Sequence, residues 1–354
     1  MTSPYNDLPN HQFWRRSIAR VEAHRVDPMI APRFRVGSAD RVVTAGSCFA
    51  QHIARRLVDI GHGFHITERG EHLPEPKRRE HGYGVFSARF GNIYTAAQLR
   101  QLLDECLGRH APGETHLVRP DGRLVDPWRQ QVEPDGFATF DDMCADRARH
   151  LAAVERMVRE ADVFVFTLGL TEGWRARADG SVYSTAPGVV AGAFDPERDE
   201  FVNFGVDEVR GDLIATLTTL KEVNPGIRVI LTVSPVPLIA TYERRSVLVS
   251  TSYSKAVLRV AAEEALRRFE WVDYFPSYEI ITGSFAGGLY YESDHREVNR
   301  LGVAHAMRCF VANFVETAGN ETVPDTGATP RLATHMAPET HIVCDEETLD
   351  GLRF

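Results

Sequence analysis

The chain has 354 residues, of which 43% are hydrophobic and 25% are charged, a usage close to that of ordinary globular proteins. No apolar run approaches the ~20 residues of a membrane-spanning helix, and the formal net charge of −9 argues against a nucleic acid or an anionic membrane as partner. The first residues also lack a secretory signal, and the five scattered cysteines show no disulfide or zinc spacing, so we expect a cytoplasmic protein.

Residues 1–38 are predicted to form an arm that packs on the body of the protein, because apolar residues recur at helical spacing in it. These residues are Phe13, Trp14, Ile18 and Val21. The main domain is expected over 39–316, followed by a loosely packed tail at 317–354. The domain begins with a short buried strand at 42–45, which leads through Gly-Ser-Cys into a helix that ends at Gly61.

Two insertions interrupt the domain, at 109–140 and 174–205. Each contains turn residues typical of a hairpin, around Pro120-Asp121-Gly122 and Asp179-Gly180. The remaining pattern alternates apolar strands with amphipathic helices. We expect strands at 163–169, 227–233 and 271–275, and helices at 95–107, 146–160, 207–222, 253–269 and 298–315.

This alternation predicts an α/β fold, a three-layer α/β/α sandwich around a mostly parallel sheet. In such sheets the ligand lies beyond the carboxyl ends of the strands. That rule selects the loops at 46–48, 169–174, 234–238 and 290–299 as the segments where catalytic or ligand-binding residues are expected.

The loop Gly46-Ser47-Cys48 places two nucleophilic side chains where a strand passes into a helix. Free N–H groups at a helix start stabilise a thiolate or an oxyanion, so Ser47 and Cys48 are both candidate nucleophiles. The alternative is structural: Ser47 caps the helix, and Cys48 is a small buried hydrophobe.

Gly46-Ser47-Cys48-Phe49-Ala50 resembles the signature of the GSCFA family, whose fold is similar to that of the SGNH/GDSL hydrolases. Four further blocks match the same family in order along the chain. They are Phe90-Gly91-Asn92-Ile93-Tyr94, Leu168–Trp174, Thr232–Val236 and Tyr274–Ile280.

The resemblance implies roles for several residues. Cys48 stands where SGNH enzymes carry the nucleophilic serine, and Ser47 stands at the aspartate before it. Gly91, with Asn92 beside it, resembles the first oxyanion-hole block. The block Gly169-Leu170-Thr171-Glu172 resembles the second, with Thr171 in the place of an asparagine. Further substrate-contact candidates at the strand ends are Gly46, Glu172, Trp174 and Ser234.

The catalytic base has two candidates. SGNH enzymes carry Asp-x-x-His before the last helix, and this chain has Glu292-x-x-His295 in that stretch but Asp294-x-x-Glu297 when the motif is aligned on its aspartate. His295 is one candidate and His305, on the last helix, is the other. Asp294 is the expected carboxylate partner.

These features predict a cofactor-independent acyl-transfer enzyme, an esterase or an O- or N-acyltransferase, that acts on a small-molecule ester or thioester such as an acyl-CoA or an acylated intermediate. The 14 histidines lack metal-ligand spacing, and no nucleotide-binding glycine motif occurs, so no metal or cofactor is expected. Two alternatives stay open: a binding or scaffold protein that has lost the catalytic residues, and a redox-active Cys48. The arm or the tail offers a surface for a homodimer.

Overall fold

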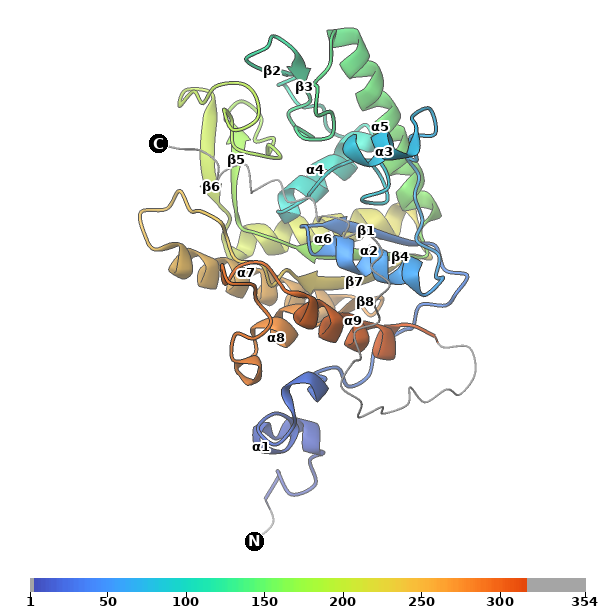
Figure 1. Cartoon of the computed structure of the whole chain (residues 1–354), viewed down its shortest axis with the longest axis vertical. Coiled ribbons are helices and arrows are strands. Elements are labelled where there is room, and N and C mark those ends of the chain that lie inside the picture. Colours follow the sequence, from blue (N-terminus) through green and yellow to red (C-terminus); the bar gives the residue numbers. More distant parts are fainter. Residues whose placement is uncertain (1–2, 317–354) are drawn as a thin grey trace.

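The computed structural model describes residues 3–316, so the tail expected at 317–354 lies outside the described residues. Its centre is a parallel sheet in the order β1-β4-β7-β8 (Figure 1). The strands are β1 (Val42–Gly46), β4 (Val163–Leu168), β7 (Arg228–Val233) and β8 (Val272–Tyr274). An isolated parallel bridge from Val42 to Phe64 extends the sheet beyond β1. The predicted parallel sheet is therefore confirmed.

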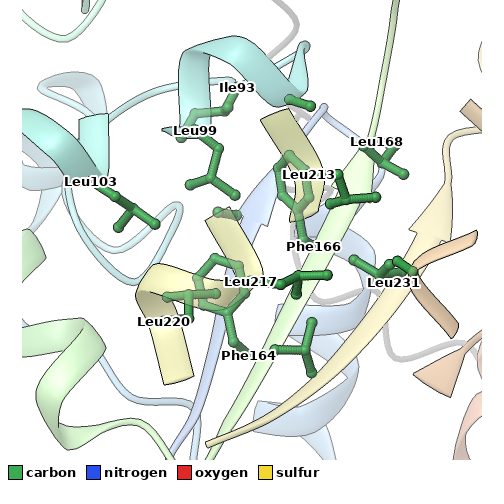
Figure 2. Packing of buried hydrophobic residues seen from close by; sticks show 14 of the residues in the cluster. Ile93, Leu99, Leu103, Phe164, Phe166, Leu168, Leu213, Leu217, Leu220 and Leu231 are labelled. Carbon is green, nitrogen blue, oxygen red and sulfur yellow. The ribbon is translucent and has the colours of Figure 1, made fainter. Parts of the chain in front are cut away.

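The strands are buried along almost their whole length, because helices cover both faces of the sheet. Successive side chains point to opposite faces. Phe164, Phe166 and Leu231 pack into one hydrophobic cluster, which Figure 2 shows together with Leu213 and Leu217 of the covering helix. Val165 and Ile230 belong to a second cluster on the other face.

The helices form the two outer layers. One layer holds α2 (Ala50–Asp59), α8 (Ser277–Thr282) and α9 (Arg300–Phe314). The other holds α4 (Ala96–Cys106), α5 (Phe140–Glu160), α6 (Val206–Val223) and α7 (Val247–Arg268). The three-layer α/β/α sandwich is thus the observed architecture.

Helix starts follow their capping residues. Thr95 forms a capping box with Gln98 at the start of α4, as its position predicted. Thr139 and Ser246 cap α5 and α7 with their side chains, so both helices begin six residues earlier than expected. The short helices α3 (Glu75–Glu80) and α8 were not predicted, because six residues are too few for a clear helical period.

The arm differs from its prediction. It holds three short helical segments, η1 (Asn10–Gln12), α1 (Trp14–Ser17) and η2 (Ala23–Arg25), and the first two lie away from the sheet at the lower end of Figure 1. None of the four residues expected to pack is buried, and Trp14 is 65% exposed. The arm is anchored instead by Val26 and by Val36, which pairs with Val315.

Both insertions contain antiparallel pairs. β2 (Leu117–Val118) and β3 (Leu124–Val125) form the predicted hairpin around Pro120-Asp121-Gly122. In the second insertion, β5 (Glu172–Ala176) pairs over five residues with β6 (Asp199–Asn203). The turn at Asp179-Gly180 gives only a single bridge, between Arg175 and Val182, so the principal partner of β5 comes from farther along the chain than expected.

Candidate active site

The loops that follow the central strands meet at one edge of the sheet. The Ser47 amide donates to the Thr167 carbonyl oxygen at 3.2 Å, and the Ser234 amide donates to the Leu168 carbonyl oxygen at 2.8 Å. Because β1, β4 and β7 are parallel neighbours, their carboxyl ends lie side by side. Three of the four loops selected from the sequence are therefore adjacent.

Gly46 allows another segment to join this edge. Its φ is 132°, and a Cβ there would lie 2.3 Å from the Thr167 carbonyl oxygen, so only glycine fits. The Gly46 carbonyl oxygen accepts a hydrogen bond from the Ile93 amide at 2.9 Å. This bond brings the block containing Gly91 and Asn92 against the end of β1.

Gly169, which follows β4, also packs against the end of β1 and the Gly91–Tyr94 block. Its amide donates to the Tyr94 carbonyl oxygen at 3.0 Å. A Cβ at Gly169 would lie 3.1 Å from that oxygen and 3.2 Å from the Cβ of Ser47. Ser47, the Gly91–Tyr94 block and Gly169 therefore pack within van der Waals reach of one another.

Ser47 and Cys48 are both buried, at 2% and 7% exposure. The Ser47 hydroxyl has no hydrogen-bond partner among residues 3–316. It does not cap α2, whose N-cap is Phe49 without a side-chain cap bond, so the structural alternative for Ser47 is wrong. A buried, unpartnered hydroxyl is costly. The amides of the first turn of α2 donate to the Ser47, Cys48 and Phe49 carbonyl oxygens, so the Ser47 hydroxyl lies beside this turn without accepting from it.

Thr171 is not available as an oxyanion-hole donor. Its hydroxyl donates its single proton to Asn203 Oδ1 at 2.7 Å, and its amide donates to Ser254 Oγ at 3.0 Å. The role that the resemblance implied for this side chain is corrected, because a hydroxyl has one proton to give. Ser234 is also a loop-forming residue, since its Oγ accepts the Val236 amide.

Glu172 and Trp174 fasten the second insertion to the loop after β7. The Glu172 carboxylate accepts hydrogen bonds from the Thr241 hydroxyl at 2.7 Å and from the Tyr242 amide at 3.3 Å. The Trp174 ring packs edge-on against Tyr242, 4.9 Å between centroids. Neither residue lines the cleft of about 480 Å³ beside α2, and the contacts that the structure gives them are within the protein.

His295 is exposed on the loop before α9, with φ of 56°. The expected carboxylate, Asp294, accepts the amides of Arg296 and Glu297 at 2.9 and 3.1 Å. It therefore shapes the turn. Tyr291 in the same loop donates its hydroxyl to the Pro235 carbonyl oxygen at 3.0 Å, which attaches this loop to the edge where Ser234 lies.

His305 is engaged elsewhere. Its Nε2 lies 2.8 Å from the Val26 carbonyl oxygen and its Nδ1 lies 2.7 Å from the Tyr290 hydroxyl. A carbonyl can only accept, so Nε2 carries the proton and Nδ1 accepts from Tyr290. Burial and the nearby Arg308 lower the pKa of this ring. His305 thus anchors the arm, and its expected role as the base is not supported.

The model of the GSCFA family matches residues 41–310. The chain belongs to the GSCFA family. No curated protein sequence matches it.

Among solved structures, a carbohydrate esterase of family 3 from Talaromyces cellulolyticus is similar at 12% identity and a TM-score of 0.29, over 78% of this chain and 94% of its own. A variant of an acetyl-xylooligosaccharide esterase from Geobacillus is similar at 15% identity and a TM-score of 0.32, over 80% of this chain and 100% of its own. At these identities and TM-scores, neither neighbour determines what this GSCFA protein acts on.

Lys255 was missed by the sequence analysis. It is 1% exposed, and its Nζ donates to the Gly169 carbonyl oxygen at 2.8 Å, which places its amino group against the loop that touches Ser47. The signal was available, because Lys255 falls on the same helical stripe as the buried Leu258 and Ala262 of α7. A charged residue on an apolar stripe marks a buried polar site.

His52 was also missed. It lies on α2 one turn beyond Cys48, with its ring 5.3 Å from that of Phe49. Burial and the charge of Arg55 lower the pKa of His52 to about 4. Among residues 3–316, no group of three or more His, Cys, Asp or Glu side chains is placed to hold a metal ion, and no helix of that part combines the length and hydropathy needed to cross a membrane.

Proposed function

We propose that this GSCFA protein is an acyl-transfer enzyme of the esterase type that uses Cys48 or Ser47 as its nucleophile. The observation that carries the proposal is the Gly46-Ser47-Cys48 junction at a helix start. There a thiol lies beside a buried hydroxyl that has no hydrogen-bond partner in the part of the chain that the structure describes. The segments that pack against this junction contain the glycines expected to form an oxyanion hole.

In the proposed reaction the nucleophile attacks the carbonyl carbon of an ester or thioester and gives its proton to a base. The carbonyl oxygen becomes an oxyanion, which backbone N–H groups near Cys48 and Gly91 stabilise in this proposal. Collapse of this intermediate expels an alcohol or thiol, which takes up the proton, and leaves the acyl group on the enzyme. Water or an acceptor hydroxyl or amine then receives the acyl group.

His295 is the proposed base. It belongs to the loop that Tyr291 attaches to Pro235 at the sheet edge, and it is exposed, so its ring is not committed to the core as that of His305 is. This assignment uses Glu292-x-x-His295 in the place of the Asp-x-x-His spacing of SGNH enzymes.

The test is turnover of activated acetyl esters and acetyl thioesters, with and without sugar, alcohol and amine acceptors. Substituting the true nucleophile, by Cys48→Ala or Ser47→Ala, should lower kcat/KM on the order of 10³-fold, while the other substitution leaves most of the rate. His295→Ala should lower it by about 10²-fold or more. His24→Ala, an exposed histidine of the arm, is the matched control and should leave kcat/KM unchanged.

A specific observation supports a second candidate, a binding protein that has lost catalysis. Thr171, His305 and Asp294 all make structural hydrogen bonds in place of their expected catalytic ones. This candidate predicts that the wild-type protein turns over none of the esters or thioesters above the buffer rate.

If the protein is an enzyme, the same assay distinguishes its type. Acceleration of acyl release by an added acceptor would favour a transferase, and an acceptor-independent rate would favour a hydrolase.

A further inference from the structure

A cleft with a volume of about 480 Å³ lies between α2 and the segment 64–85. This size falls within the range of small-molecule sites. Its charged lining consists of Arg55, Arg69, Arg78, Arg79, Asp59 and Glu75. Four arginines against two carboxylates give the cleft a local excess of 4 − 2 = +2, although the whole chain carries a net charge of −9.

The carboxylates do not neutralise this charge. Glu75 pairs with Arg78 at 3.1 Å, and Asp59 is the second carboxylate of a lining that holds three further guanidinium groups. Burial and then the positive charge of Arg79 lower the pKa of Arg55, and Asp59 opposes this shift. Arg55 and Arg79 line the same cleft, so like charges share its wall, an arrangement that an anion between them stabilises.

Much of the remaining lining of the cleft is apolar. It includes Ala54 and Val58 of α2 and Phe64 and Ile66 of the neighbouring segment. A pocket with an apolar wall and a few guanidinium groups suits a ligand that has both an anionic group and an uncharged part. A bare inorganic ion would use only half of this lining.

The cleft adjoins the candidate active site. Gln51 lines it and lies one turn after Cys48, with its amide donating to the Cys48 carbonyl oxygen at 3.1 Å. On the other side, Arg79 and Val85 also line a smaller cavity that includes Gly91. A ligand in the cleft therefore lies next to the two blocks that carry the proposed nucleophile and oxyanion hole.

We propose that this cleft binds a phosphate-type anionic group of the acyl donor or acceptor, with Arg55, Arg69 and Arg79 as its ligands. The part of the proposal that concerns an acyl substrate rests on the proposed function. The binding of the anion itself does not. Bidentate guanidinium contacts to phosphate oxygens supply the affinity, and the apolar wall accommodates the uncharged part of the ligand.

The experiment is isothermal titration calorimetry with inorganic pyrophosphate and with coenzyme A, at low ionic strength. Both should bind the wild-type protein. The double variant Arg69→Gln/Arg79→Gln, which changes two exposed side chains, should bind each probe at least about tenfold more weakly. Arg159→Gln is the matched control, because Arg159 is an exposed arginine that pairs with Glu155 on α5, and it should keep the wild-type affinity.

The proposal is overturned if neither probe binds the wild-type protein, or if the double variant binds both as tightly as the control does. Tenfold tighter binding of coenzyme A than of pyrophosphate assigns the anion to a coenzyme A thioester donor. Equal affinities assign it to another phosphorylated substrate. Cys48→Ala should keep the affinity whether or not the protein transfers acyl groups, so a failure of the proposed function is distinguishable from a failure of the anion site.

Discussion

Two buried regions of this protein are stabilised in different ways. The sandwich around the sheet is almost entirely apolar, with residues such as Phe166 and Leu217 packed between the strands and α6 (Figure 2). The region above it, between α5 and the segments 62–93 and 109–140, contains a buried ionic network. In it, Asp146 pairs with Arg89 at 3.0 Å and with Arg129 at 2.9 Å.

The ionic network extends in both directions. Arg129 also pairs with Asp126 at 2.8 Å, and Arg147 bridges Asp126 to Glu105. Burial opposes ionisation of Asp126, but Arg147 and Arg129 hold its pKa well below the usual range. The network therefore stays charged in the interior.

The contrast shows what each kind of interior does for the site. Apolar packing is non-directional and stabilises the sheet. Ion pairs and their hydrogen bonds are directional, and Arg89 lies two residues before Gly91 while its carbonyl oxygen accepts from Arg129 Nη1 at 3.4 Å. We infer that the network fixes the position of the Gly91 block against the end of β1.

The largest expected effect comes from breaking the network. Asp146→Ala leaves Arg89 and Arg129 buried without their shared carboxylate, and should lower the free energy of unfolding by about 3–5 kcal/mol. Urea denaturation checks this value. Glu155→Ala, which removes an exposed ion pair on the same helix, should cost about 0.5 kcal/mol or less. A cost for Asp146→Ala as small as that of the control contradicts a structural role for the network.

Shortening a side chain in the apolar region should lower the free energy of unfolding by a comparable or slightly smaller amount. Unlike the loss from breaking the network, this loss should not depend on salt. Leu217→Ala should cost about 2–5 kcal/mol through lost burial and the cavity that remains. The cost should be the same at low and high salt, because no charge is involved, and Leu217→Met should cost less than about 1.5 kcal/mol. A strong salt dependence of the Leu217→Ala effect would remove the distinction between the two regions.

A fall in pH below 6.5 should lower the stability of both regions, through one histidine in each. His150 lies beside the network, with its Nδ1 2.8 Å from Glu68 Oε2, and burial and the charge of Arg129 lower its pKa from 6.5 to about 4. Burial and the charge of Arg55 lower the pKa of His52 to about 4. Below pH 6.5 the unfolded chain binds protons that the folded chain does not bind until about pH 4, so stability present above pH 6.5 falls as the pH drops through this window.

The slope should reach about 1.4 kcal/mol per pH unit for each histidine. Urea denaturation at about pH 7 and about pH 5, within the window that these pKa values define, measures it. His150→Gln and His52→Leu should each make the dependence shallower. If both variants keep the wild-type slope, the two rings are not held neutral by burial.

The smallest expected effect on stability lies where the two regions meet at the site. Gly169→Ala places a Cβ 3.1 Å from the Tyr94 carbonyl oxygen and 3.2 Å from the Ser47 Cβ, so a neighbour must move by a few tenths of an ångström. The cost should be about 1 kcal/mol, with a larger loss of any acyl-transfer rate because Ser47 is displaced. Gly211→Ala, on α6 with open space around it, is the control and should be neutral or stabilising.

Much of the fold could be predicted because its signals are local. The apolar run of β4, the Thr95 cap and the Pro120-Asp121-Gly122 turn each determine structure within a few residues. Interactions between distant segments could not be predicted in this way. Nothing in the sequence near Thr171 indicates that its hydroxyl donates a hydrogen bond to Asn203. Nothing near His305 indicates that its ring forms a hydrogen bond with the carbonyl oxygen of Val26 in the arm.

The ionic network was hidden for a related reason. Charged residues in a sequence are by default assigned to the surface, and Arg89 and Asp146 are separated by 57 residues. Within the candidate site, the glycines and the Ser47-Cys48 pair were predictable from the strand-to-helix pattern and the family blocks. The partners of Thr171, Asp294 and His305 required the structure.

Intact-protein mass spectrometry after incubation with activated acyl esters and acyl-CoA thioesters tests the central claim most directly. The account predicts one added acyl group on the wild-type protein, which is lost in Cys48→Ala or in Ser47→Ala but not in both, and which peptide mapping places on the segment 47–48. The absence of an adduct and of turnover with every donor, or an adduct that both variants keep, contradicts the claim that this strand-to-helix junction is an acyl-transfer site.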